Sequence, residues 1–200
     1  MVVQTDKGLG LGVIKPKQYF QFSIKYHIVD ARTYQCLIPE AAVYRATLVR
    51  KRLEKWIKIH LDVLNKEERK FLCTNLGLNK EPWGFLYLLF KVQKVLLNTR
   101  PIVLYCGNLL RPLGQLIAEW LQPLSRMHKS YFQYSFTLRK ELDLQKIPSN
   151  ARLFICGATF MYTNIRTSQA LHLIGQFVLN NDKHMTVQPA VLMDALHLFM

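Results

Sequence analysis

The stretch PWGFLYLLFKVQKVLLNTRPIVLYCG, residues 82–107, gives the strongest indication of the fold. It contains two apolar runs rich in leucine, valine and aromatic residues, one beginning near Phe85 and the other within TRPIVLYCG. Such residues favour strands, and only the short link Val95–Asn98 separates the two runs. This stretch therefore predicts a β-hairpin.

Two further elements are predicted at the N-terminal end of the chain. VVQTDKGLGLGVI, residues 2–14, alternates short apolar runs with glycines, which predicts a second hairpin turning near residues 6–8. Residues 17–29 have the three- and four-residue apolar spacing of an amphipathic helix.

The longest predicted helix runs from about residue 40 to residue 61 and carries most of its charge as cations. Its apolar residues fall at helical spacing, and six basic residues crowd the rest against one acid, Glu54. The six are Arg45, Arg50, Lys51, Arg52, Lys55 and Lys58. Such a run is either a solvated helix face or a contact surface for nucleic-acid phosphates, and the sequence leaves both interpretations open.

The remaining elements alternate helix and strand. Asn65 precedes Glu68 by three residues, the spacing of a capping box, so a helix is predicted to begin there. A buried strand is predicted over residues 152–158, and further helices over 113–124, from Ser135, over 167–179 and from Pro189. The last helical pattern runs to Met200 with no stop signal, which predicts a truncated domain. The fold class is therefore α+β.

The composition indicates a globular chain with a polyanionic partner. Half of the 200 residues are hydrophobic, 12% are aromatic, and the net charge is +14. Residues 151–200 contain only three basic and two acidic residues, so nearly all of this excess lies in residues 1–150. Four widely spaced cysteines fit reduced thiols in an intracellular protein, the nucleus included, and no zinc spacing, secretory leader or membrane span is recognisable.

Three motifs in chain order resemble a reverse transcriptase of the Penelope-like or a related non-viral retroelement kind. TDKGLGLGVI, residues 5–14, resembles that family's opening A-D-K-G/N motif. FKVQK, residues 90–94, followed six residues later by RPIV, resembles its K-x-H-K … R-P-I-V-S finger motifs. MYTNI, residues 161–165, resembles the end of its first palm motif, which is Asp, two residues, Ser, an apolar residue, an aromatic residue and then T-N-I.

The resemblance covers nearly the whole chain and implies a right-hand polymerase. Residues 1–150 would be the basic fingers region, and residues 151–200 would be the incomplete start of the palm. The family implies Mg²⁺ as cofactor, and an RNA or DNA template-primer and a nucleotide as partners. No membrane is implied.

The resemblance also implies roles for individual residues. Arg100 and the lysines Lys91 and Lys94 would contact the nucleotide phosphates, because a guanidinium binds phosphate bidentately. An ordinary surface arginine and strand-edge lysines are the alternatives. Tyr162 would pack under the sugar of the nucleotide and exclude a 2′-OH, unless it is simply a core aromatic. Asp6 matches the opening motif, although a role in the hairpin turn is equally open.

Gly157 is the departure with the largest consequence. It occupies the position of the metal-binding aspartate in the first palm motif, and glycine offers no ligand. The paired aspartates of the family's second palm motif do not occur in these 200 residues, while Gln93, Leu104 and Phe160 also depart from the pattern. The expectation is a fragment of a reverse-transcriptase domain without catalytic activity. The alternatives are a nucleic-acid-binding module derived from such a domain, a decayed element without function, and a basic membrane-binding protein.

Overall fold

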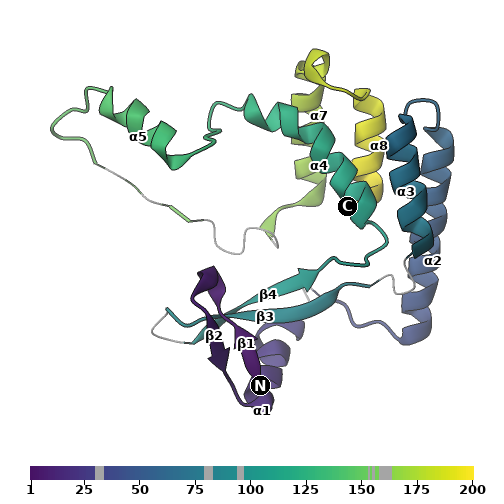
Figure 1. Ribbon diagram of the computed structural model, residues 1–200, viewed down its shortest axis with the longest axis horizontal. Helices are drawn as coiled ribbons and strands as arrows, with labels where there is room; N and C mark the ends of the chain where they lie inside the picture. Colours follow the sequence, from purple (N-terminus) through teal and green to yellow (C-terminus); the bar gives the residue numbers. More distant parts are fainter. Residues whose placement is uncertain (30–33, 79–82, 94–96, 153, 155, 158–163) are drawn as a thin grey trace. The chain divides into compact units, whose positions relative to one another are not determined.

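The computed structural model describes residues 1–29, 34–78, 83–93, 97–152, 154, 156–157 and 164–200 (Figure 1). Helices and two small antiparallel sheets make up this part of the chain, so the predicted α+β class is confirmed at that level. The chain divides into two compact units, Met1–Pro112 and Leu113–Met200. The predicted division at residue 150 stays a prediction.

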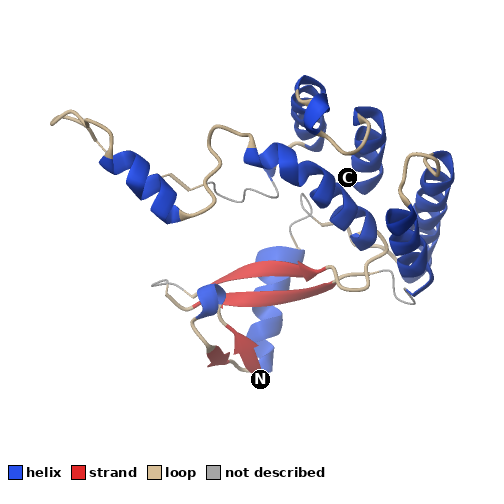
Figure 2. Cartoon of the chain, turned by 45° about the horizontal axis from the view of Figure 1, so that its top comes forward, coloured by secondary structure: helices blue, strands red, loops and turns tan. Residues whose placement is uncertain are grey.

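Two hairpins and one helix belong to unit 1. Strands β1 (Val2–Gln4) and β2 (Leu11–Val13) pair around a 3-10 turn at Asp6–Gly8, and β3 (Phe85–Lys91) pairs with β4 (Asn98–Leu104). Figure 2 shows both hairpins in red. The left-handed backbone of the first turn explains its glycines, since φ is +68° at Gly8 and +95° at Gly10. Both predicted hairpins are confirmed.

Helix α1 (Pro16–Ser23) continues into a π-helical turn (Ile24–Ile28) and covers one face of these strands. Val3, Leu88 and Phe90 are buried there, and Ile14, Tyr19 and Phe22 pack against them. The hydroxyl of Tyr19 accepts a hydrogen bond from the backbone N–H of Leu88 at 3.1 Å. An isolated parallel β-bridge between Thr5 and Phe90 links the two hairpins, which are far apart in the sequence.

Two more helices of unit 1 lie between α1 and β3 in the chain, and both were predicted. Helix α2 spans Pro39–Ile59 and α3 spans Lys66–Leu78. The capping box before α3 forms as expected, because Glu68 N–H donates to the side chain of Asn65 at 2.9 Å and Asn65 N–H donates to that of Glu68 at 2.8 Å. Arg50 on α2 donates to the carbonyl of Leu76 on α3 at 2.8 Å, which ties the two helices together.

Unit 2 is helical in its described part. Its helices are α4 (Arg111–Arg126, whose first turn contains the unit boundary), α5 (Ser135–Asp143), α7 (Thr167–Asn180) and α8 (Pro189–Phe199). Glycines allow close approach: a Cβ on Gly114 would lie 2.6 Å from the ring of Phe199, and one on Gly175 would lie 3.3 Å from Met193. The core of the unit lies on α4, α7 and α8, whereas every residue of α5 is exposed.

The buried strand predicted over 152–158 is wrong for the residues of that stretch that the structure describes. Arg152, Phe154, Cys156 and Gly157 are in no strand, and Phe154 is 81% exposed. Residues 153, 155 and 158 lie outside the described part. An apolar run becomes a buried strand only when a neighbouring strand supplies hydrogen bonds, and no described strand pairs with these residues.

Gly84 offers a test of the packing beside the β3–β4 hairpin. A Cβ there would lie 2.8 Å from both the carbonyl oxygen of Leu104 and a methyl group of Val103. Gly84→Ala is therefore expected to lower the free energy of unfolding by about 1–3 kcal/mol, because a backbone atom cannot yield cheaply. Urea unfolding followed by circular dichroism would measure the change. Gly157→Ala is the matched control, since a Cβ there meets nothing within 4 Å.

Candidate functional site

An ion pair joins two of the motifs that the sequence singled out. Arg100 lies in β4, and Asp6 opens the 3-10 turn between β1 and β2. The guanidinium Nη1 of Arg100 lies 3.2 Å from Oδ1 of Asp6. The side chain of Asp6 is 3% exposed and that of Arg100 is 49% exposed, so a buried carboxylate holds a cation that still faces solvent.

The second carboxylate oxygen of Asp6 adds an unusual feature to this pair. Oδ2 is buried and has no hydrogen-bond partner among the described residues. A buried charge without full pairing costs free energy, and that cost is tolerable here only because Arg100 neutralises Asp6. Loss of Arg100 would therefore leave the buried carboxylate of Asp6 without its cation, whereas loss of the Asp6 charge would leave Arg100 in contact with solvent.

Lys91 shares a sheet face with Arg100. In the β3–β4 register, Arg100 is opposite Leu89 and Lys91 is opposite Asn98. Paired residues share a face, and residues two apart along a strand share it as well. Arg100 and Lys91 therefore lie on the face opposite Leu88 and Phe90, which face α1. Even with Asp6 paired to Arg100, these two cations leave a net positive charge on this face, which suits an anionic ligand.

The other residues predicted to bind the nucleotide cannot be placed. Lys94 and Tyr162 lie outside the described residues, as does Phe160. Gln93 and Leu104, which depart from the family pattern, are both exposed, Leu104 at 40%.

His27 belongs to the same neighbourhood, and the sequence interpretation missed it. Its Nε2 lies 2.7 Å from the hydroxyl oxygen of Thr99, the buried residue just before Arg100. Burial lowers the pKa of His27 below its usual value, and the positive charge of Lys91 lowers it further. A signal existed in the spacing, because Tyr19, Ser23 and His27 follow at four-residue intervals.

The lowered pKa of His27 predicts a stability that falls in weak acid. The folded state binds the proton less readily than the unfolded chain does, so lowering the pH through about 6.5 favours unfolding. Urea unfolding between about pH 7.5 and pH 5.5 would measure the trend. His27→Gln keeps a hydrogen-bonding side chain and does not titrate, so this variant should show a flatter pH profile. An unchanged profile would show that other groups cause the loss.

The basic residues of helix α2 are of two kinds, one half-buried and the others exposed. Leu53, Trp56 and Ile57 are its buried residues. Arg50 is half-buried and is tied to the carbonyl of Leu76, so it has a structural role. The other five predicted basic contacts are exposed: Arg45, Lys51, Arg52, Lys55 and Lys58.

Three of these cations form a line, which we call the lysine ridge: Lys51, Lys55 and Lys58. Spacings of four and three residues place them on one side of the helix, within an arc of about 60°. That arc is opposite the buried residues Leu53, Trp56 and Ile57. The ridge itself contains no acidic residue, but Glu54 lies beside it, three residues after Lys51 and four before Lys58, and offsets part of its positive charge.

Gly157 is exposed, and a side chain added there would meet nothing within 4 Å. The position therefore has room for an aspartate. Among the described residues, no group of three or more His, Cys, Asp or Glu side chains could hold a metal ion. The described residues around Gly157 therefore provide no carboxylate set for a Mg²⁺ site.

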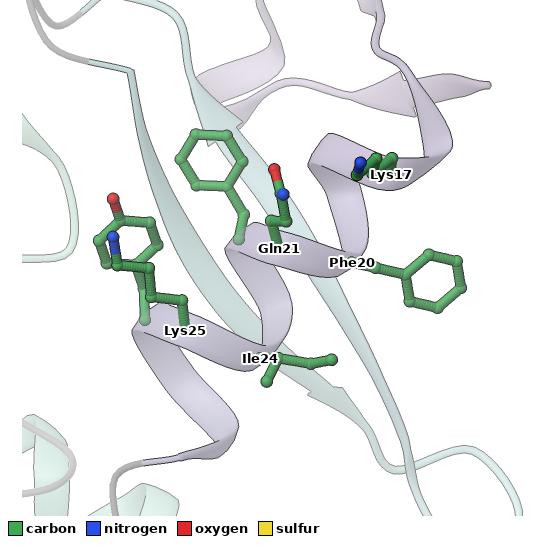
Figure 3. Close-up of a pocket in the computed structure, with 7 residues that line it drawn as sticks. Lys17, Phe20, Gln21, Ile24 and Lys25 are labelled. Carbon is green, nitrogen blue, oxygen red and sulfur yellow. The ribbon is translucent and has the colours of Figure 1, made fainter.

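A shallow hollow of about 600 Å³ runs along α1 and the π-helical turn (Figure 3). All of its lining residues come from this one segment, between Lys17 and Tyr26. None of the residues predicted to bind a ligand lines it. A hollow with walls from a single helix does not enclose a ligand, so it is a weaker candidate than the Asp6–Arg100 pair or the lysine ridge.

No helix in the described part of the chain is both long enough and apolar enough to cross a membrane. Comparison of the chain with models of protein families, with curated proteins and with solved structures gives no match in any of the three.

Proposed function

We propose that this chain is the fingers region and the start of the palm of a reverse-transcriptase-type domain, which binds nucleic acid and nucleotide phosphates without catalysing polymerisation itself. The observation that supports this most is the Asp6–Arg100 ion pair at 3.2 Å. It brings together the opening motif and the R-P-I-V motif, which stand far apart in the sequence. Arg100 keeps half of its side chain exposed, as contact with a phosphate requires.

The charge distribution supports the nucleic-acid part of the proposal. The lysine ridge and the exposed Arg45 and Arg52 supply cations along a 21-residue helix. Phosphate contacts of this kind do not depend on the base sequence of the nucleic acid, and they release counterions condensed on its backbone. A basic binding module derived from such a domain would share this property.

The proposed lack of catalysis depends on Gly157 and on the absence of paired aspartates from the 200 residues. Two-metal phosphoryl transfer needs carboxylates that clamp both metal ions. One carboxylate alone would not assemble such a site, so Gly157→Asp is not expected to restore activity.

Two measurements on the wild-type chain test the proposal. Fluorescence anisotropy with labelled single-stranded RNA should show an affinity that falls steeply with salt, with a slope of roughly −0.7 per phosphate contact. An affinity that is independent of salt would reject nucleic-acid binding. Primer extension on an RNA template with Mg²⁺ should give no product, and extension by the purified chain would reject the proposed inactivity.

A decayed element without function is the second candidate, and one observation favours it. Between Tyr134 and Phe154, several large apolar side chains are strongly exposed, among them Phe136 at 73% and Leu144 at 83%. Such exposure is unusual for a stable monomer. A broad, non-cooperative urea transition together with strong binding of a hydrophobic dye would favour this candidate over a binding module.

A further inference from the structure

Tyr44 lies on the same line of α2 as the lysine ridge. It precedes Lys51 by seven residues, which is close to two full helical turns. Tyr44, Lys51, Lys55 and Lys58 therefore share an arc of about 60° on the side opposite the buried residues of the helix. At 1.5 Å of rise per residue, the line from Tyr44 to Lys58 is about 21 Å long.

The ring of Tyr44 is available to a ligand. The residue is 64% exposed, so much of the apolar surface of its ring faces solvent. A single exposed aromatic residue is ordinary on a protein surface. An exposed ring at the end of a row of three cations is a more specific arrangement.

The charges select the chemistry of the partner. The line from Tyr44 to Lys58 contains three lysines, and Glu54 at its side leaves a net positive charge. The acidic Glu40 lies one turn before Tyr44 in the first turn of the helix. A polyanion is favoured along this line and disfavoured beyond its N-terminal end. Among polyanions, one with exposed flat rings can also stack on the ring of Tyr44.

We propose that Tyr44 stacks on a base of single-stranded nucleic acid while the lysine ridge contacts the phosphates that follow it. Sites for single strands combine a cationic track with aromatic residues on which bases stack. A duplex keeps its bases inside the helical stack, so it can use the lysines but not the ring. The inference depends on the proposed nucleic-acid binding and adds a preference for single strands.

The test compares Tyr44→Ala with Tyr44→Phe, using labelled single-stranded RNA and a duplex of the same length in parallel anisotropy titrations. Tyr44→Ala should weaken single-strand binding by about 5- to 150-fold, the usual effect of losing one stacked base, and should leave duplex binding within about twofold. Tyr44→Phe keeps a flat ring and should bind like the wild type. Both variants should fold, because the side chain is mostly exposed.

Phe136→Ala on α5 is the matched control, since Phe136 is a similarly exposed aromatic residue outside the lysine ridge. It should leave both affinities unchanged. An equal loss on single strands and duplex in Tyr44→Ala, no loss at all, or a Tyr44→Phe variant as weak as Tyr44→Ala would each overturn stacking while nucleic-acid binding stands. Failure of the wild-type chain to bind any RNA would reject the proposed binding and the inference together.

Discussion

Replacing Lys51, Lys55 and Lys58 together by glutamate should lower the affinity for single-stranded RNA by about 100-fold or more at low salt. Each lysine of the ridge is exposed and lies on one side of α2, so a single strand can meet all three. Each lost phosphate contact should also reduce the salt slope by roughly 0.7, giving a total reduction of about 2. Anisotropy titrations at several salt concentrations would measure both quantities.

The control for this triple variant must change the net charge equally. Lys129, Lys140 and Lys146 are exposed residues of unit 2, and their replacement by glutamate changes the charge by the same amount. If binding follows a defined surface, this control triple should lose much less affinity than the ridge triple. Equal losses would mean that RNA responds to the overall charge of +14 and not to α2.

The ridge illustrates what a sequence can predict. Helical periodicity alone placed Val49, Leu53, Trp56 and Ile57 on one face of α2, because apolar residues recur there at three- and four-residue spacing; the last three are buried and Val49 is half-buried. The same periodicity indicated that the cations crowd the remaining surface. The capping box at Asn65 and Glu68 was predictable for the same reason, since it depends on a spacing of three residues. Both hairpins were likewise indicated by short links between apolar runs.

Contacts between distant segments were not predictable from spacing. Nothing local in the sequence pairs Asp6 with Arg100 or His27 with Thr99, because these contacts form only when the two hairpins and α1 pack together. The structural role of Arg50 was hidden for a similar reason, because its acceptor is the carbonyl of Leu76 on the next helix. A charge run does not show which of its members are used inside the fold.

The strand prediction for residues 152–158 was wrong for a different physical reason. Its apolar residues have strand propensity, but such propensity mainly reflects how well a side chain fits a sheet that already exists. With Phe154 81% exposed, the described residues of this stretch have no such partner. The resemblance to a first palm strand thus stays a prediction that concerns the sequence alone.

The second large effect concerns stability, and it should be unequal for the two members of the Asp6–Arg100 pair. Arg100→Ala leaves the carboxylate of Asp6 buried, charged and without its cation, since Oδ2 has no described partner either. Losing one partner of a buried pair is strongly destabilising. The half-exposed side chain of Arg100 reduces the effect, so we expect a loss of about 2–4 kcal/mol in the free energy of unfolding.

Asp6→Asn should cost much less, about 1 kcal/mol or below, because a neutral amide is cheaper to bury and Arg100 can turn to water. The double variant Asp6→Asn/Arg100→Ala should then be more stable than Arg100→Ala alone, a result that simple additivity does not give. Urea unfolding of the four proteins in one buffer measures the cycle. Equal losses in the two single variants, with no rescue in the double variant, would show that the buried carboxylate does not depend on Arg100. The arginine would then be an ordinary surface residue, and the main support for joining the two motifs would be lost.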